Sequence, residues 1–316
     1  MPVNLRLFAL AIICAILYVS VAVADKFVLP PDDQYMIGVV REITVGRDTT
    51  LSDEARRYNV GFNEIRLANP WIDPWLPENG SKVILPTQHL IPDVPRKGIV
   101  LNVPEMRLYY FPKPERNSPP VVITNPVSIG RGDWETPLGQ TKVIAKTTDP
   151  VWRPPESIRN EHAAEGDILP KVVPAGPENP LGKHALRLGL PGYLIHGTNK
   201  PYGIGMQVTH GCVRMYPEDI EAIYDLVPVG TPVNIVQQPY KFGWYLDMLY
   251  LEAHPPFRGD NSTAPDIKSL YDAVRKINEK LAPGQKVDWD DALRIARNPA
   301  GMPVPVKVIQ NENGPA

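Results

Sequence analysis

The chain has 316 residues and a formal net charge of −2 at pH 7, which argues against a nucleic-acid partner because such proteins usually carry a basic excess. Hydrophobic residues make up 43% of the chain, enough for a folded protein with a substantial core rather than a disordered one. Prolines number 37, above the usual frequency of about one in twenty, and proline breaks long helices. We therefore expect mainly strands, joined by shaped loops.

Residues 1–24 have the layout of a secretory signal peptide. Arg6 supplies a short positive region, an apolar run follows, and residues 22–24 (AVA) offer a small–x–small cleavage pattern. The apolar run is also long enough for a retained membrane anchor, which is the alternative. Cys14 is a poor lipoprotein site because the bulky Ile13 precedes it. No later segment approaches about 20 uninterrupted apolar residues, so we expect no transmembrane domain after cleavage.

Residues 35–87 form a first candidate module. A strand is predicted over residues 35–45, followed by a turn and a helix over 51–58 with Thr50 or Ser52 as its N-cap. A second short helix is predicted over 62–68, and a strand over 82–86 that ends at a proline. The expected order is strand, helix, helix, strand. Residues 88–97 then read as a proline-punctuated linker.

A second, strand-rich domain is predicted from residue 98 to residue 236. Residues 99–103 and 106–111 flank Pro104-Glu105 and predict a hairpin. Further strands are predicted over 121–129, 141–147, 185–188, 193–196 and 231–236, with a helix from Pro217 to about Val227. The glycine- and proline-rich loop 130–139 is long enough to shape a cleft. Residues 149–184 lack regular patterning, and a stretch of that length is usually functional or a lid.

Residues 237–316 form a C-terminal extension with one clear amphipathic helix. Its apolar side chains recur at spacings of three and four residues, at Ile267, Leu270, Val274, Ile277 and Leu281. We expect this stripe to pack on the preceding domain, and we assign it no chemistry.

Cys212 would be the single cysteine left after signal cleavage. An odd cysteine in an exported protein cannot form an internal disulfide and is flagged as intermolecular or reactive. A thiol becomes a good nucleophile as the thiolate, and an imidazole beside it can take its proton. His196 and His210 are the two candidate bases. A reactive Cys212 thiol is therefore the favoured interpretation.

His196 is the preferred base. It ends a predicted strand sixteen positions before Cys212, which leaves room for a loop that returns beside the thiol. His210 lies only two positions away, and in an extended turn the two side chains would be placed less favourably for proton transfer. Gly211 permits a tight turn and, with Cys212, offers backbone N–H groups to an oxyanion. The carbonyl of Gly197, or that of His196, could orient the imidazole.

A metal site made of His196, His210 and Cys212 is a weaker reading, because it supplies three ligands without the short spacings of zinc sites. We therefore expect no metal and no cofactor.

The motifs around Cys212 resemble those of the L,D-transpeptidases, the YkuD-type cysteine enzymes of bacterial cell walls. Residues 195–198 read IHGT, and residues 209–215 read THGCVRM. The blocks 136–139 (TPLG) and 176–182 (GPENPLG) belong to the same likeness, as does Asn199. The resemblance covers roughly residues 97–236 and implies a β-sandwich with the cysteine at its rim.

The resemblance implies that Cys212 is the nucleophile and His196 the proton donor and acceptor. Cys212 would attack the diaminopimelate carbonyl of a peptidoglycan tetrapeptide stem, release D-alanine and form a thioester. An amine then takes the acyl group, either from a second stem or from a lysine of an outer-membrane lipoprotein. The supporting or oxyanion residues would be His210, Gly211 and Gly197. Arg214 suits a stem carboxylate, although a pairing that holds the turn is equally open, and the remaining substrate-binding candidates are Thr198, Asn199 and Thr209.

The module at 35–87 resembles a LysM domain. The likeness rests on residues 48–51 (DTTL), 55–60 (ARRYNV), 67–70 (LANP) and 83–86 (VILP). It implies binding to peptidoglycan glycan chains, although residues 71–75 (WIDPW) enlarge one loop, and a packing module without glycan affinity is the alternative.

The order of domains is similar to that of Gram-negative periplasmic members, so we expect a periplasmic protein that acts in cell-wall biogenesis and cell shape. Three alternatives stay open: a carboxypeptidase that uses water as acceptor, a non-catalytic peptidoglycan-binding protein, and a sortase. The sortase is disfavoured because the short motif of those enzymes lacks the His-Gly that precedes Cys212. Oligomeric state is not predicted.

Overall fold

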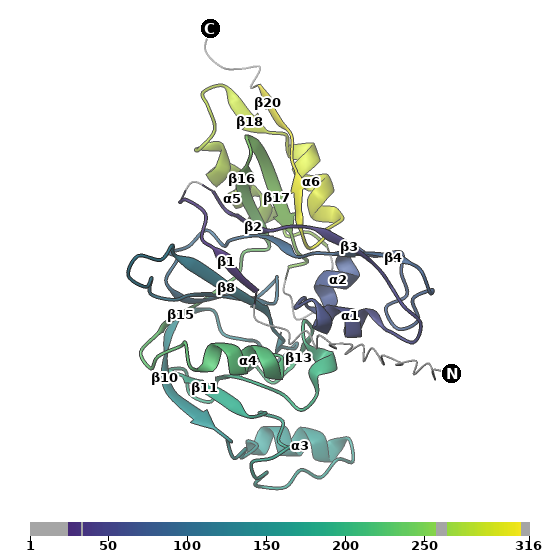
Figure 1. The fold of residues 1–316 in the computed structure, drawn as a ribbon, viewed down its shortest axis with the longest axis vertical. Coiled ribbons are helices and arrows are strands. Elements are labelled where there is room, and N and C mark those ends of the chain that lie inside the picture. The colour runs from purple at the N-terminus through teal and green to yellow at the C-terminus, as the bar shows by residue number, and fades with distance from the viewer. Residues whose placement is uncertain (1–24, 33, 257–263, 311–316) are drawn as a thin grey trace, which may run out of the picture.

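The computed structural model describes residues 25–32, 34–256 and 264–310. Its main element is a mixed nine-stranded sheet in the order β1-β8-β7-β6-β15-β10-β11-β12-β14 (Figure 1). The strands, in that order, are Asp25–Val28, Val121–Pro126, Arg107–Phe111, Gly98–Asn102, Pro232–Val236, Gly139–Thr148, His184–Leu188, Leu194–His196 and Val213–Arg214. The mainly β architecture is confirmed, and so is the hairpin β6–β7, whose strands pair antiparallel from Gly98–Phe111 to Asn102–Arg107.

The sheet bends along its longest strand. The first half of β10 pairs with β15, and after an irregularity between Val143 and Ala145 the second half pairs with β11. Such an irregularity bends a strand and increases its twist. The sheet therefore curls around one apolar core, with helix α4 (Pro217–Tyr224) adding Ile220 and Ile223 to it. The strands expected to form a sandwich thus belong to one curled sheet.

The N-terminal module consists of β3 (Arg41–Thr44), α1 (Leu51–Arg57), α2 (Phe62–Ala68) and β4 (Lys82–Leu85), with β3 paired to β4. Helix α1 begins as predicted, because Thr50 and Asp53 form a capping box. The single strand predicted over 35–45 is wrong. It splits into β2 (Met36–Gly38) and β3, since Gly38 has φ +73° and passes so close to Thr87 that a Cβ would lie 2.0 Å from its carbonyl oxygen.

The predicted linker 88–97 is partly a strand. Its first residues form β5 (Gln88–Leu90), which pairs antiparallel with β2. The module is also docked on the main sheet, because Arg107 of β7 makes two buried hydrogen bonds of 2.7 Å to the Glu64 carboxylate of α2. The module is therefore packed on the main sheet rather than separated from it by a free linker.

The C-terminal extension is mixed rather than helical. Helix α5 (Ile267–Asn278) occupies the predicted segment and buries Leu270, Val274 and Ile277. It packs with α6 (Trp289–Arg297) on a three-stranded sheet of β16 (Tyr240–Tyr245), β17 (Met248–Ala253) and β19 (Pro303–Pro305). A short pair, β18 (Gln285–Val287) and β20 (Val308–Gln310), completes it. The apolar stripe of α5 thus belongs to a core of its own.

Among the described residues, no helix combines the length and apolar character needed to cross a bilayer. The predicted signal peptide 1–24, with Cys14, lies outside these residues.

Candidate functional site

Cys212 lies on a tight turn between β13 (Gln207–Thr209) and β14. Gly211 has φ +94°, and a Cβ there would lie 2.8 Å from Cε1 of Tyr193, so the turn requires glycine. The hydroxyl of Thr209 donates to the Cys212 carbonyl oxygen at 2.6 Å, and that of Thr136 donates to the Gly211 carbonyl oxygen at 2.9 Å. The turn is thus held from the strand before it and from the loop 130–139.

The sheet register places His196 and Arg214 on one face, beside the turn that carries Cys212. Strands β12 and β14 run parallel, with Ile195 opposite Val213 and His196 opposite Arg214. Ile195 and Val213 point into the core, so His196 and Arg214 lie on the other face. Cys212 lies on the turn immediately before β14. The parallel pairing therefore puts this turn beside the strand that ends at His196.

The Cys212 thiol is partly exposed and is not ionised in advance. Its Sγ donates to the Gly192 carbonyl oxygen at 3.6 Å, and no hydrogen bond to His196 is formed within the described chain. Burial raises the pKa of the thiol, although a backbone hydrogen bond from Leu194 and the charge of Arg214 partly oppose this. A rotation about the Cα–Cβ bond of Cys212 would release Sγ from Gly192.

The His196 imidazole is buried and oriented by its neighbour. Its Nδ1 donates to the Gly197 carbonyl oxygen at 2.6 Å, one of the two carbonyls proposed to orient the ring. With this proton on Nδ1, Nε2 is the nitrogen that can accept a proton in the neutral ring. Burial, assisted by the Arg214 charge, lowers the pKa of His196 to about 4, although hydrogen bonds to the Gly197 and Leu181 carbonyls partly oppose this. At neutral pH the site therefore holds a neutral imidazole and a neutral thiol.

His210 belongs to a different network. Its Nε2 lies 2.9 Å from the Glu161 carboxylate and 3.2 Å from Nη2 of Arg131, which is itself paired with Glu161. Its ring also meets the Trp134 indole edge-on, with centroids 5.0 Å apart. Burial and the Arg131 charge lower the pKa of His210 to about 4. His210 thus connects the nucleophile turn to the segment that carries Glu161.

Glu161 was missed because its helix was missed. The segment 149–184, expected to lack regular structure, contains helix α3 (Glu156–Ala164), which lies at one end of the molecule (Figure 1). Only Ile158 of α3 is buried, so there is no apolar stripe for a sequence pattern to reveal. Arg131 and Thr136 stood inside the predicted cleft loop, but only the fold shows that they contact the turn.

The remaining candidates line the same region with different contacts. Arg214 is half-buried, and its Nε has no hydrogen-bond partner in the described parts of the chain. Thr198 is buried, and its hydroxyl accepts from Lys200 N at 2.9 Å. Asn199 donates from Nδ2 to the Glu178 carbonyl oxygen at 3.1 Å. Among these three candidates, Arg214 is therefore the one with an unpaired hydrogen-bond donor for an anionic ligand.

Comparisons with known proteins identify the family. Residues 96–235 match the family model YkuD, described as the L,D-transpeptidase catalytic domain. The chain is 38% identical to the probable L,D-transpeptidase ErfK/SrfK of Salmonella typhimurium, covering 90% of this chain and 91% of that protein. The chain belongs to the L,D-transpeptidase family. It is also 36% identical to the probable L,D-transpeptidase YbiS of Escherichia coli K12, covering 96% and 99%. The L,D-transpeptidase 3 of Mycobacterium tuberculosis is 18% identical, with a TM-score of 0.32 over 69% of this chain and 99% of that one.

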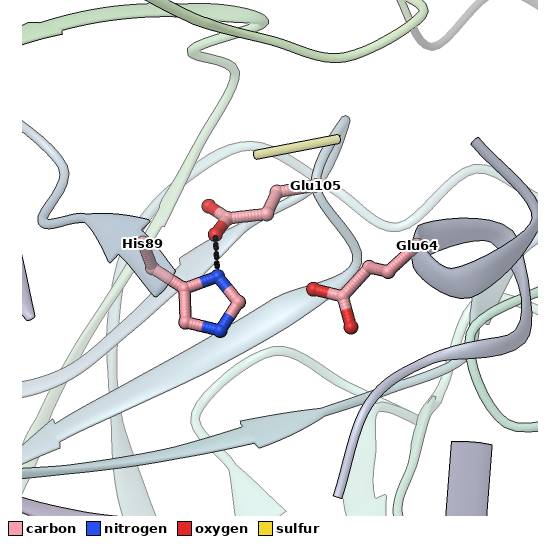
Figure 2. A group of neighbouring side chains, drawn as sticks. All are labelled: Glu64, His89 and Glu105. Carbon is pink, nitrogen blue, oxygen red and sulfur yellow. Dashed lines mark ion pairs between the residues drawn. The ribbon is translucent and has the colours of Figure 1, made fainter. Parts of the chain in front are cut away.

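A second cluster of ionisable side chains in this L,D-transpeptidase lies away from Cys212. His89 of β5 lies beside the carboxylates of Glu64 and Glu105 (Figure 2), with its Nδ1 3.9 Å from the nearer oxygen of Glu105. Both carboxylates already have a cation, since Arg107 binds Glu64 and the Lys241 ammonium lies 2.8 Å from Glu105. The donor set does not fit a metal ion, and the cluster instead joins the N-terminal module, the main sheet and the C-terminal unit.

The pKa shifts predict how Cys212 reacts with a small alkylating reagent. Because burial raises its pKa, the thiolate fraction should grow about tenfold per pH unit through neutrality. We expect the rate of iodoacetamide labelling to rise continuously from pH 6 to about pH 8.5. Time courses of intact mass measure this rate, and Cys212→Ala reports labelling elsewhere. A rate that is already constant below pH 7 would contradict a protonated resting thiol.

Proposed function

We propose that the chain is a peptidoglycan L,D-transpeptidase in which Cys212 forms the acyl-enzyme. The observation that carries this proposal is the pairing of the strand that ends at His196 with the strand that follows Cys212, inside the region that matches the family's catalytic domain. The donor substrate would be a tetrapeptide stem whose diaminopimelate carbonyl is attacked. No cofactor is required by this chemistry.

In the acylation step, Sγ of Cys212 bonds to the diaminopimelate carbonyl carbon while Nε2 of His196 takes the thiol proton. The C–N bond to D-alanine then breaks, and the imidazolium returns the proton to the leaving amine. Because thiol and imidazole are both neutral at rest, proton transfer accompanies the attack. Backbone N–H groups of Gly211 and Cys212 are the proposed oxyanion donors.

In the deacylation step, an amine attacks the thioester carbonyl and loses its proton to His196, and Cys212 leaves as the thiol. The acceptor is either a second diaminopimelate stem or a lysine of an outer-membrane lipoprotein. Water in its place would give a carboxypeptidase. Arg214, whose Nε lacks a partner among the described residues, suits a stem carboxylate. Direct substrate contacts of Thr198, Asn199 and Thr209 stay a prediction.

The two histidines are expected to differ strongly in a rate comparison. His196→Ala removes the proposed base and should lower kcat by about 10²- to 10⁴-fold. His210→Ala removes a contact to Glu161 rather than the proton acceptor, and we expect a loss of about tenfold or less. Release of D-alanine from a tetrapeptide stem measures both rates. Equal losses for the two variants would refute His196 as the sole base.

The acceptor can be identified from cell walls. We expect walls of cells that carry the protein to contain products absent from cells that lack it, as determined by mass spectrometry of digested muropeptides. Dimeric stems linked through diaminopimelate would identify a cross-linking enzyme, lipoprotein-tagged stems an anchoring enzyme, and tripeptides alone a carboxypeptidase. No change in any of these would favour a non-catalytic wall-binding protein.

We further propose that the protein is periplasmic, exported by residues 1–24, and that the module at 35–87 is LysM-like and binds glycan. The order β3-α1-α2-β4 supports the likeness, and the exposed Trp71 and Trp75 offer aromatic faces for sugar rings although their loop departs from the LysM pattern. Co-sedimentation of the Cys212→Ala protein with purified peptidoglycan tests the glycan affinity.

A further inference from the structure

The loop that leads to the nucleophile turn lies against the N-terminal module. This loop comprises the 3₁₀ turn η1 (Pro201–Gly203) and residues 204–206, and it continues into β13. The backbone N–H of Phe62 donates to the Ile204 carbonyl oxygen at 3.0 Å, and that of Asn63 donates to the Gly205 carbonyl oxygen at 3.2 Å. The first turn of α2 therefore fixes the loop seven positions before Cys212.

The backbones of the module and the loop lie so close together at Gly61 and Gly205 that no Cβ fits between them at Gly205. Gly205 has φ +84°, and a Cβ there would lie 2.3 Å from Phe62 N and 2.4 Å from the Cα of Gly61. A Cβ on Gly61 would in turn lie 3.0 Å from the Cα of Gly205. Any side chain at Gly205 would therefore push the loop away from the module.

The opposite side of the loop borders the proposed active site. Ser128 Oγ donates to the Gly203 carbonyl oxygen, and a Cβ on Gly203 would lie 3.9 Å from Nη1 of Arg214. The backbone of Ser128 also exchanges two hydrogen bonds with Arg214, of 2.8 and 2.9 Å. At its end the loop reaches Thr209, which holds the Cys212 carbonyl. A shift of this loop would therefore reach both Arg214 and the nucleophile turn.

The module can act as a fixed support because it is anchored through a buried ion pair. Both carboxylate oxygens of Glu64 accept hydrogen bonds from Arg107 of the main sheet, and Oε2 also accepts from the Gly61 N–H at 2.5 Å. Glu64 therefore also fixes Gly61, the residue that contacts Gly205. On the surface, Arg56 of α1 forms a two-point pair with Glu218 of α4, at 2.8 and 3.0 Å. The path from the sheet to the loop thus runs through Arg107, Glu64, Gly61 and Gly205.

We propose that the docked N-terminal module is a positioning element for the reaction at Cys212, with Gly61 and Gly205 as its positioning residues. This role rests on the proposed cysteine mechanism and is separate from any glycan affinity of the module. The active enzyme then requires both units, because the module supplies one side of the support for the loop before the nucleophile.

Gly205→Ala in the full chain tests this role, with Gly230→Ala as the matched control. Gly230 has a similar φ of +92° but no atom within 4 Å of its Cβ position. Alanine there is strained in its backbone conformation but makes no steric clash with a neighbouring segment. We expect Gly205→Ala to lower kcat for D-alanine release from a soluble tetrapeptide by about 10- to 100-fold relative to Gly230→Ala. The iodoacetamide labelling rate of Cys212 should change as well, and both rates are compared at a temperature well below the unfolding of the less stable Gly205→Ala variant.

Gly61→Ala provides a second test if Gly205→Ala does not fold. Gly61 has φ −81°, which alanine adopts without strain, and its Cβ would lie 3.0 Å from the Cα of Gly205, 3.3 Å from Oε2 of Glu64 and 3.4 Å from the Cβ of Pro126. We expect a smaller fall in kcat, of about 3- to 10-fold. If the wild-type protein is active, and kcat of Gly205→Ala equals that of Gly230→Ala while kcat of Gly61→Ala equals that of the wild type, the positioning role is overturned and the proposed function stands. A wild-type protein without turnover or thiol acylation would instead refute the proposed function itself.

Discussion

Replacing Cys212 by alanine is expected to abolish D-alanine release and transfer, by about 10⁵-fold or more in kcat. Removal of a nucleophile eliminates the covalent route, and what remains is the small contribution of binding and oxyanion contacts. Release of D-alanine from a tetrapeptide stem and the mass of the trapped acyl-enzyme measure the loss. Cys212→Ser keeps the shape of the side chain and should be nearly as inactive, since serine lacks the acidity of a thiol.

Cys212→Ala should leave the fold intact. Sγ makes a long hydrogen bond of 3.6 Å to the Gly192 carbonyl oxygen and accepts one from the Leu194 backbone, both weak because sulfur is a poor partner, so we expect the free energy of unfolding to change by less than about 1 kcal/mol. Peptidoglycan binding by the module should also persist. Turnover that survives in Cys212→Ala would rule out the thioester mechanism, whereas a large fall in the unfolding temperature would make the rate comparison uninformative about chemistry.

The sequence was most informative where function depends on adjacent residues. The pattern around His196 and Cys212 predicts the strand, the glycine turn and the orienting carbonyl, because each depends on a few consecutive residues. Capping by Thr50 and the start of α4 at Pro217 are local in the same way. Such features can be predicted from spacing and residue type alone.

The features that sequence patterns missed depend on distant partners. Helix α3 buries only Ile158, and its place in the site follows from the contact between Glu161 and His210, 49 positions apart. The break at Gly38 follows from a close approach to Thr87. The docking of the module follows from Glu64 and Arg107, 43 positions apart. Spacing rules contain no information about these pairs, so residues 88–97 were expected to be a linker and the docking was not predicted.

Breaking the buried ion pair between Arg107 and Glu64 is expected to lower the stability of the folded chain. Arg107 is fully buried, and it also donates to the Asn59 carbonyl oxygen at 3.3 Å. Arg107→Met leaves the Glu64 carboxylate buried without its cation, and we expect the free energy of unfolding to fall by about 3–5 kcal/mol. Chemical denaturation of the full chain measures this loss.

The double variant Glu64→Gln/Arg107→Met separates the charge from the packing. It removes both charges while keeping side chains of similar size, so much of the lost stability should return. The glutamine amide oxygen can still accept from the Gly61 N–H, but both hydrogen bonds from Arg107 are lost, so the recovered protein should still show slower turnover than wild type. A single variant that is as stable as wild type would show that the pair does not anchor the module, and the path from the main sheet to the loop before Cys212 would then lose its first link.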